Sequence, residues 1–276
     1  MIMQLSLAYS PCPNDTFMFD AMVHGRLCRT MQFAEPALMD IEHLNGKAGL
    51  SEYDITKISY AQFFNVKDQY QLLHSGSALG RNCGPLLIAK RNIDLYNADL
   101  TVAIPGYHTT ANQLLKFAFP HIQHRVELCF SEIEEAVSGG KVDLGLIIHE
   151  SRFTYQQKGL IKIADLGEIW EEKTGSPIPL GGIVVRRNLD DKVKREIDGL
   201  LKASIGYAFH HPEVSLPYCR SHAQEMDDEV MQSHIHLYVN EYSVDIGKDG
   251  MEAVRILGES ILERKISDKE LRSFFI

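Results

Sequence analysis

A histidine follows directly on a short apolar run near the middle of the chain. His149 comes after residues 144–148 (LGLII), which have the length and composition of a buried β-strand. An imidazole titrates near neutral pH, so at the carboxyl end of a strand beside a ligand it is suited to proton transfer. A histidine with a purely structural role would give the same pattern, and the residues alone leave both interpretations open.

The segment SPCPNDT at residues 10–16 joins an expected strand to an expected helix. Its two prolines favour a stiff, extended loop, and Asn14 or Asp15 is of the type that caps a helix N-terminus. Such a terminus offers free N–H groups to an anion, so we expect Asn14 and Asp15 beside a ligand. A plain capped turn is the alternative. Cys12 has no evident base in the sequence, so a nucleophilic role for it is not indicated.

A second junction, PGYHTTANQLL at residues 105–115, has the order strand, glycine turn and helix. The hydroxyl groups of Thr109 and Thr110, with the amides of Thr110 and Ala111, could hold a carboxylate or a phosphate. Helix capping alone would explain the same residues.

A third junction is TKISYAQ, at residues 56–62, where Lys57 and Ser59 flank Ile58 at a strand end. Lys57 could face a ligand site, but taken alone a lysine is expected to face solvent.

Several classes of protein are not indicated. The chain has no HExxH, no Cys/His cluster and no acidic ligand loop, so the sequence predicts no metal site, and it has none of the usual nucleotide-binding glycine motifs. A net charge of -9 argues against broad nucleic-acid binding. The five cysteines form no CxxC pair, and no export signal or membrane span is recognisable, so we expect reduced thiols and a cytoplasmic location. The sequence allows an oligomer.

Strand-like and helix-like segments alternate along the chain, which predicts an α/β protein with mostly parallel βαβ units. Residues 93–177 contain their own strand–helix series, and the chain returns from them through the apolar strand 178–189. We therefore expect two lobes, one of residues 1–92 plus 178–276 and an inserted one of residues 93–177. Two connections between such lobes are typical of bilobed solute-binding proteins, which enclose a ligand in a cleft.

The motifs SPCPNDTFMF, YDITKIS, PGYHTTANQLL, DLGLIIHE and PIPLGG occur in this order along the chain. In this order and rough spacing they resemble the 1,4-dihydroxy-6-naphthoate synthases of the futalosine route to menaquinone, over essentially the whole chain. The resemblance implies a periplasmic-binding-protein-like fold of the second type, with mixed sheets flanked by helices.

The resemblance also implies an activity and a set of site residues. The enzyme would be a cytoplasmic carbon–carbon lyase that converts cyclic dehypoxanthinylfutalosine to 1,4-dihydroxy-6-naphthoate without a cofactor. His149 would act as the base or nucleophile. The substrate, a small carboxylated molecule, would contact Lys57, Ile58 and Ser59 and also Thr109, Thr110 and Ala111. Two alternatives are chorismate dehydratase of the same pathway and a binding protein for a small acid that performs no chemistry.

Overall fold

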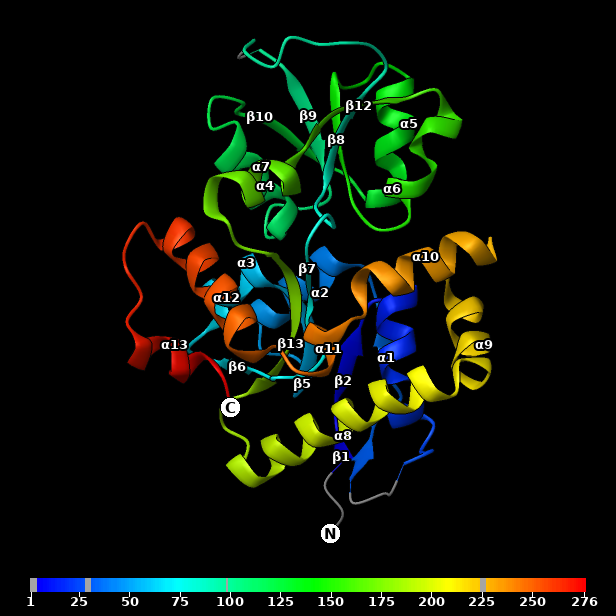
Figure 1. Cartoon of the computed structure of the whole chain (residues 1–276), viewed down its shortest axis with the longest axis vertical. Coiled ribbons are helices and arrows are strands. Elements are labelled where there is room, and N and C mark those ends of the chain that lie inside the picture. Colours follow the sequence, from blue (N-terminus) through cyan, green and yellow to red (C-terminus); the bar gives the residue numbers. More distant parts are fainter. Residues whose placement is uncertain (1–3, 28–30, 98, 224–226) are drawn as a thin grey trace. The chain divides into compact units, whose positions relative to one another are not determined.

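The computed structural model describes residues 4–27, 31–97, 99–223 and 227–276, so Cys28 lies outside the described residues. The chain divides into two compact units (Figure 1). The first comprises Met1–Gly80 and Pro179–Ile276, and the second comprises Arg81–Ile178. The first unit is thus formed by two separate stretches of sequence, as expected for a chain with an inserted segment.

A mixed sheet forms the centre of the first unit. Its strand order is β4-β2-β5-β13-β6, and β7 pairs with β13. β2 is parallel to β4 and β5, whereas β13 is antiparallel to β5 and β6, so the returning chain enters the middle of the sheet. Pro36 separates β3 from β4, since a proline has no N–H to donate within a continuous strand. The strands of this unit are β1 (Gln4–Leu5), β2 (Leu7–Tyr9), β3 (Gln32–Phe33), β4 (Ala37–Leu38), β5 (Ile55–Ser59), β6 (Tyr70–Leu72), β7 (Ala78–Gly80) and β13 (Ile178–Arg186).

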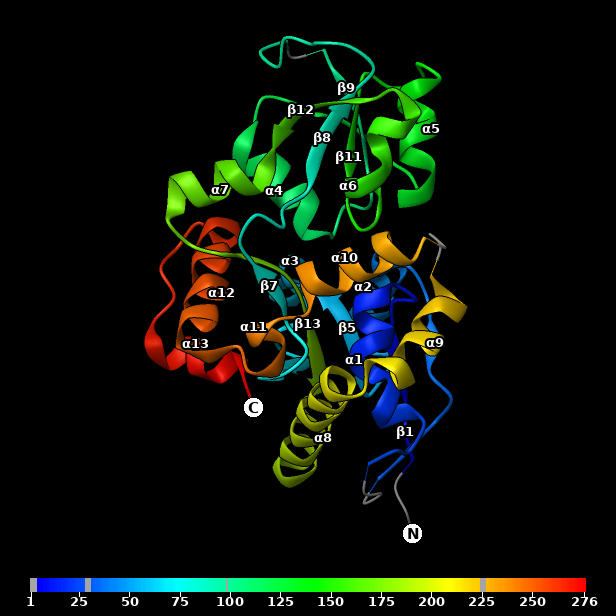
Figure 2. The same cartoon turned by 45° about the vertical axis from the view of Figure 1, so that its right-hand side comes forward.

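Helices lie on both sides of this sheet. Figures 1 and 2 both show α1 and α9 gathered on one side and α12 and α13 on the other. The core joins α1 to β2, where the ring of Phe19 stacks on that of Tyr9 with 4.3 Å between centroids. The helices are α1 (Pro13–Val23), α2 (Ile41–Gly49), α3 (Tyr60–Val66), α8 (Asp191–His210), α9 (Pro212–His222), α10 (Asp228–Tyr238), α11 (Glu241–Val244), α12 (Gly247–Leu262) and α13 (Asp268–Phe274).

The second unit has a sheet of its own, with the order β10-β9-β11-β8-β12. β9, β10 and β11 are parallel, and β8 runs antiparallel to both of its neighbours. We expected the first lobe to extend to residue 92, but β8 belongs to this second sheet because it pairs with β11 and β12. The strands are β8 (Leu86–Ala89), β9 (Thr101–Ile104), β10 (His124–Glu127), β11 (Leu144–Ile147) and β12 (Ile161–Asp165).

The helices of the second unit also cover both faces of its sheet, with α4 and α7 on one side and α5 and α6 on the other (Figures 1 and 2). Trp170 on α7 is completely buried and its indole lies 4.9 Å from the ring of Phe117 on α4. Among the described residues, every helix is too short or too polar to span a lipid bilayer. The helical segments are α4 (Thr110–Ala118), η1 (Phe130–Glu132), α5 (Ile133–Ser138), α6 (Ser151–Thr154), η2 (Tyr155–Lys158) and α7 (Leu166–Thr174).

Candidate active site

The loop before α1 places a carboxylate in the interior of the first unit. The helix begins at Pro13, whose fixed φ and missing N–H suit the first helical position. Cys12 is therefore the N-cap residue, and it makes no side-chain capping bond. The expectation that Asn14 or Asp15 caps this helix is wrong, because both lie inside its first turn. Both side chains are buried.

Asp15 is held by three donors. The ammonium Nζ of Lys57 lies 2.9 Å from Oδ1, Asn14 Nδ2 donates to the same oxygen at 2.8 Å, and the backbone N–H of Ser10 donates to Oδ2 at 3.3 Å. The exposed fractions of the Asp15 and Lys57 side chains are only 2% and 5%. The expectation of a solvent-facing lysine is thus wrong, because the carboxylate of Asp15 compensates for the burial of the ammonium.

Ser59 ends β5, two residues after Lys57, and neighbouring α2 holds it in place. Its backbone N–H donates to Asn45 Oδ1 at 2.9 Å, and Asn45 Nδ2 donates to its Oγ at 3.0 Å. Residues two apart on a strand lie on the same face, so Lys57 and Ser59 share a face of β5 and Ile58 points the other way. This face of β5 therefore carries an ammonium and a hydroxyl group.

Two glycines of β13 leave room for these side chains. A Cβ at Gly181 would lie 2.9 Å from the carbonyl oxygen of Ile58 and 3.0 Å from Cε of Lys57. A Cβ at Gly182 would lie 2.9 Å from the ring of Tyr60, which hydrogen-bonds to Ser77. Burial raises the pKa of the Tyr60 phenol, so this group stays neutral. The PIPLGG segment thus lets the backbone of β13 approach the residues around Ser59 closely.

The second unit places the threonine junction at the start of α4. Thr109 is the N-cap residue: its Oγ1 accepts from Asn112 N at 3.2 Å and donates to Gly106 O at 2.8 Å. Its hydroxyl is therefore used for capping, as the alternative interpretation proposed. Thr110 and Ala111 are buried in the first turn. The N–H groups of a first helical turn have no partner within the helix.

His149 lies two residues beyond β11, which is the central strand of its sheet. The strand was expected to continue to His149 but ends at Ile147. His149 has a positive φ of 57°, a left-handed conformation in which histidine and asparagine are enriched among residues other than glycine. The ring of Phe130 meets the imidazole edge-on, with 4.9 Å between centroids. Packing and backbone geometry thus restrict the direction of the imidazole.

The described cysteines form no disulfide. Cys12, Cys83 and Cys219 are buried, whereas Cys129 is exposed. Burial raises the pKa of the Cys83 and Cys219 thiols to about 12, so both are protonated at neutral pH. The burial of Cys12 agrees with its interpretation as a compact filler of the loop.

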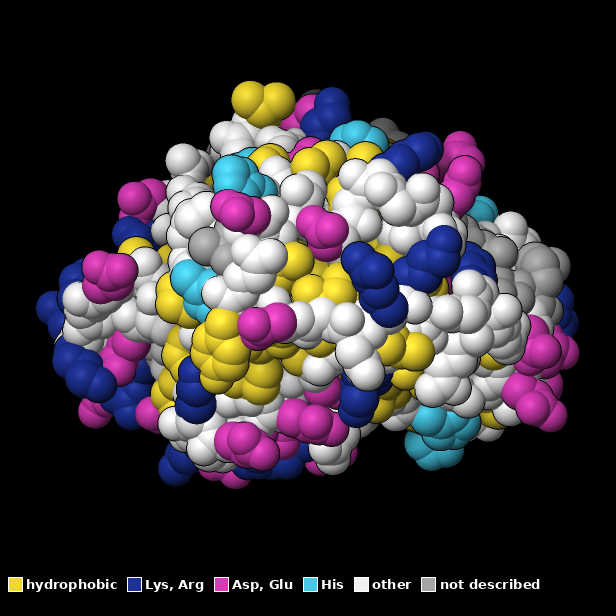
Figure 3. Space-filling view, turned by 90° about the horizontal axis from the view of Figure 1, so that it is seen from above, with side chains coloured by type: hydrophobic (Ala, Val, Ile, Leu, Met, Phe, Trp, Pro, Cys, Tyr) yellow, Lys and Arg dark blue, Asp and Glu magenta, His cyan; other side chains and the backbone are white. Residues whose placement is uncertain are grey.

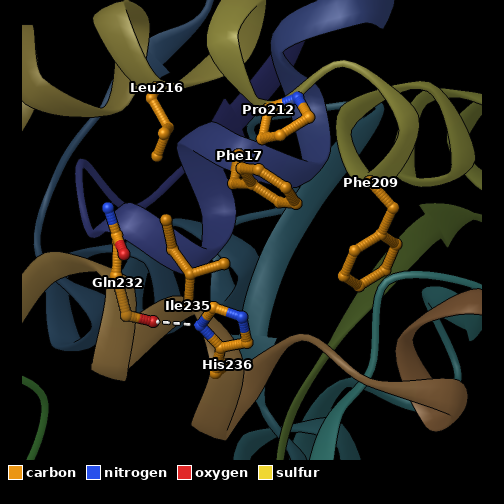
Figure 4. Close-up of a pocket in the computed structure, with 7 residues that line it drawn as sticks. All are labelled: Phe17, Phe209, Pro212, Leu216, Gln232, Ile235 and His236. Carbon is orange, nitrogen blue, oxygen red and sulfur yellow. Dashed lines mark hydrogen bonds between the residues drawn. The ribbon is translucent and has the colours of Figure 1, made fainter.

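A cavity of about 290 Å³ lies between α1, α8, α9 and α10 of the first unit (Figure 4). None of the residues predicted to bind substrate lines it. Gln232 and His236 are its polar lining residues, and His236 Nδ1 is already hydrogen-bonded to the carbonyl oxygen of Gln232 at 2.8 Å. The cavity therefore offers little to a carboxylate. Its other lining residues are Phe17, Phe209, Pro212, Leu216 and Ile235.

The surface gives no sign of a polyanion-binding face in the view of Figure 3. Acidic and basic side chains are interspersed over it, apart from one small group of basic side chains right of the centre. This agrees with the overall net charge of -9.

Asn45 lies outside the motifs that indicated the candidate site residues. It lies on α2 four residues after Ile41 and directly after Leu44, both of which are buried. A polar residue on the apolar face of an amphipathic helix is a signal that could have identified it, because buried polar groups need partners.

The two sheets, each mixed and flanked by helices, define an α/β protein with a periplasmic-binding-protein-like fold. The chain superposes on the periplasmic aliphatic sulphonate binding protein SsuA of Escherichia coli with a TM-score of 0.66, at 10% identity and covering 99% of this chain and 92% of that one. The menaquinone biosynthesis family matches residues 5–261, and this chain belongs to that family. The family resemblance recognised in the sequence is thus confirmed.

Relatives at higher identity cover nearly the whole chain. A 1,4-dihydroxy-6-naphtoate synthase of Thermus thermophilus is 45% identical over 273 residues, 99% of each chain. An enzyme of the same name from Streptomyces coelicolor is 47% identical over 260 residues, 91% of this chain and 90% of its own. A crystal structure of an Archaeoglobus fulgidus protein gives a TM-score of 0.90 at 34% identity, and covers 94% of this chain and 97% of that one.

Proposed function

We propose that this protein is a 1,4-dihydroxy-6-naphthoate synthase, a carbon–carbon lyase acting on cyclic dehypoxanthinylfutalosine. The observation that carries the proposal is the 45% identity to an enzyme of that name, which extends over 99% of both chains. A match of this extent includes both units.

The proposal assigns substrate binding to polar groups in each unit. In the first unit these are Lys57 and Ser59, with Ile58 adjacent, and in the second they are the first turn of α4 at Thr110 and Ala111, following Thr109. An ammonium, a hydroxyl and helix N-terminal amides are all donors, and donors are what a carboxylate requires. Asn14 and Asp15 support this arrangement by orienting Lys57, since Asp15 accepts from its ammonium.

The proposal assigns proton transfer to His149. A neutral imidazole can remove a proton from the spiro-linked sugar portion of the substrate. A retro-aldol-like cleavage of the carbon–carbon bond then releases the sugar-derived fragment, and formation of the aromatic naphthalene ring favours this step. The edge-on packing of Phe130 supports this role, because a restricted imidazole loses less freedom when it reaches the reacting atom. The reaction written in this way needs no cofactor. Since the family acts in menaquinone biosynthesis, we place the enzyme in the cytoplasm.

The two alternatives are less well supported. Both enzymes reported above, from Thermus thermophilus and Streptomyces coelicolor, carry the name of the synthase rather than of chorismate dehydratase. The binding-protein likeness rests on structures of low identity, such as SsuA at 10%, and concerns the fold alone.

One assay separates the three functions. Purified full-length protein is incubated with cyclic dehypoxanthinylfutalosine and, separately, with chorismate, and the products are followed by naphthoate fluorescence and mass spectrometry. We expect 1,4-dihydroxy-6-naphthoate from the first substrate and no enolpyruvyl-containing product from chorismate. A product from chorismate alone would identify the dehydratase, and the absence of any product would favour a binding protein.

A further inference from the structure

Asn45 and Ser59 form a clamp between α2 and the end of β5. Asn45 is completely buried, and its amide makes the two bonds to Ser59 described above. Its Nδ2 also donates to Oε2 of Glu42 at 3.2 Å, and Gln62 Nε2 donates to its backbone carbonyl at 2.9 Å. The Asn45 amide is therefore held by Ser59 and Glu42, and the Asn45 backbone by Gln62. Through its amide, Asn45 fixes both the backbone and the hydroxyl group of Ser59.

The chemistry of the donors determines the direction of these bonds. A backbone N–H can only donate, so the Asn45 atom that faces the N–H of Ser59 must be the amide oxygen. The other arm of the amide is then the NH₂ group, which has no acceptor capacity, and its contact with the Glu42 carboxylate agrees. The Ser59 oxygen consequently accepts from Asn45, and its own hydrogen must point elsewhere.

Ser59 does not use its hydroxyl in the usual way for its position. It is the N-cap residue of α3, where a serine commonly accepts from a backbone N–H of the first turn, yet it makes no side-chain capping bond. Within the described ranges, the hydroxyl hydrogen of Ser59 meets no acceptor. Ser59 is only 3% exposed, and a buried donor without an acceptor costs free energy. A bound ligand could supply the missing acceptor.

We propose that Asn45 is a positioning residue that presents Ser59 as a hydrogen-bond donor to the carboxylate of an aromatic acid. The class of ligand rests on the proposed function. A carboxylate can only accept, so a serine that offers its hydrogen attracts it, whereas a serine that offers its lone pairs repels it. Lys57 shares the face of β5 with Ser59, and its ammonium, paired with the Asp15 carboxylate, is a second donor on the same side.

The variant Asn45→Asp reverses this polarity with almost no change in shape. One carboxyl oxygen still accepts from the Ser59 backbone, but the other no longer donates, so the Ser59 hydroxyl turns to donate to it. The variant also adds a charge, so the effect of Asn45→Asp is measured twice, once with Ser59 present and once in a protein that also carries Ser59→Ala. The control is Asn65→Asp, because Asn65 Nδ2 donates to Gln62 at 2.8 Å and not to Ser59.

Two measurements are made on each full-length variant: the Kd of 6-hydroxy-2-naphthoate by calorimetry, and kcat and KM for cyclic dehypoxanthinylfutalosine. We expect N45D to raise Kd and KM at least about tenfold when Ser59 is present, the size of a hydrogen bond to a charged group. With S59A also present, N45D should change both by less than about threefold, since the residual effect is that of charge alone. We expect kcat to change less than KM, and N65D to leave Kd unchanged.

An equal effect of N45D with and without S59A would overturn the positioning role. Failure of the wild-type protein to bind the naphthoate would overturn it as well. A Kd effect that depends on Ser59, together with no turnover of cyclic dehypoxanthinylfutalosine, would support the clamp and contradict the proposed function. If N45D does not fold, the single variant S59A tests the proposal. An unchanged Kd for the naphthoate in S59A would rule out a hydrogen bond donated by Ser59 to the naphthoate carboxylate.

Discussion

The buried ion pair of Asp15 and Lys57 gives a prediction whose size follows from the structure. The nitrogen–oxygen distance is 2.9 Å and both side chains are at most 5% exposed, so solvent screens the pair little. Removing one partner of such a pair leaves an uncompensated buried charge and costs about 3–5 kcal/mol of unfolding free energy. We therefore expect Asp15→Asn and Lys57→Met each to be strongly destabilised.

The two single variants should lose different amounts of unfolding free energy. In Lys57→Met the Asp15 carboxylate keeps the donors Asn14 Nδ2 and Ser10 N–H. In Asp15→Asn the Lys57 ammonium loses the one carboxylate that pairs with it among the described residues. We expect Asp15→Asn to be the less stable of the two, and the double variant to recover much of the loss because neither charge remains.

The assay is chemical unfolding in urea, followed by circular dichroism for both units and by the fluorescence of Trp170 for the second unit alone. The first transition reports the less stable unit, and its assignment is checked by hydrogen exchange of β5 peptides. Lys47→Met is the matched control, because Lys47 pairs with Glu52 at the surface, where both side chains are more than 40% exposed, and should leave the transition unchanged. Single variants within about 1 kcal/mol of the wild type, or additive losses in the double variant, would refute the reasoning.

Two further predictions concern packing and thiol reactivity. Gly182→Ala should lower the unfolding free energy by about 1–3 kcal/mol in thermal unfolding, because the new Cβ would lie 2.9 Å from the buried ring of Tyr60. The control Gly199→Ala should cause no such loss, because its Cβ would meet nothing within 4 Å. Equal stability of the two variants would contradict this prediction. Iodoacetamide at pH 8 should label the exposed Cys129 but leave Cys219 unlabelled, because burial raises the pKa of the Cys219 thiol to about 12. Labelling is measured by peptide mass spectrometry, and rapid labelling of Cys219 in the folded protein would contradict its burial.

Much of the fold could be predicted from local patterns. The helices α2, α8 and α10 follow from local sequence, since each begins after an aspartate that caps it: Asp40, Asp190 and Asp227. The sequence did not predict α9, because Pro217 lies inside it. Nor did it place β8 in the second sheet, since that depends on antiparallel pairing with β11 and β12, far along the chain.

The site could be predicted in part. The motifs indicated Lys57, Ser59, Thr109 and His149 as candidate site residues, which stay predictions, but they did not indicate the surroundings of these residues. The burial of Lys57 depends on Asp15, which is 42 residues earlier in the chain, so local sequence gave only the average preference of a lysine for solvent. The proposed polarity of Ser59 likewise depends on a partner from another element. Whether the two units act as the predicted lobes stays a prediction.

The central claim is that the protein makes 1,4-dihydroxy-6-naphthoate and that His149 transfers the proton. The most direct test is the turnover of cyclic dehypoxanthinylfutalosine by the wild type and by His149→Asn, because asparagine tolerates the positive φ of 57° at this position better than alanine does. With unfolding temperatures matched, we predict naphthoate formation by the wild type and a loss of at least about 100-fold in kcat in the variant. Near wild-type turnover by His149→Asn would contradict the assignment.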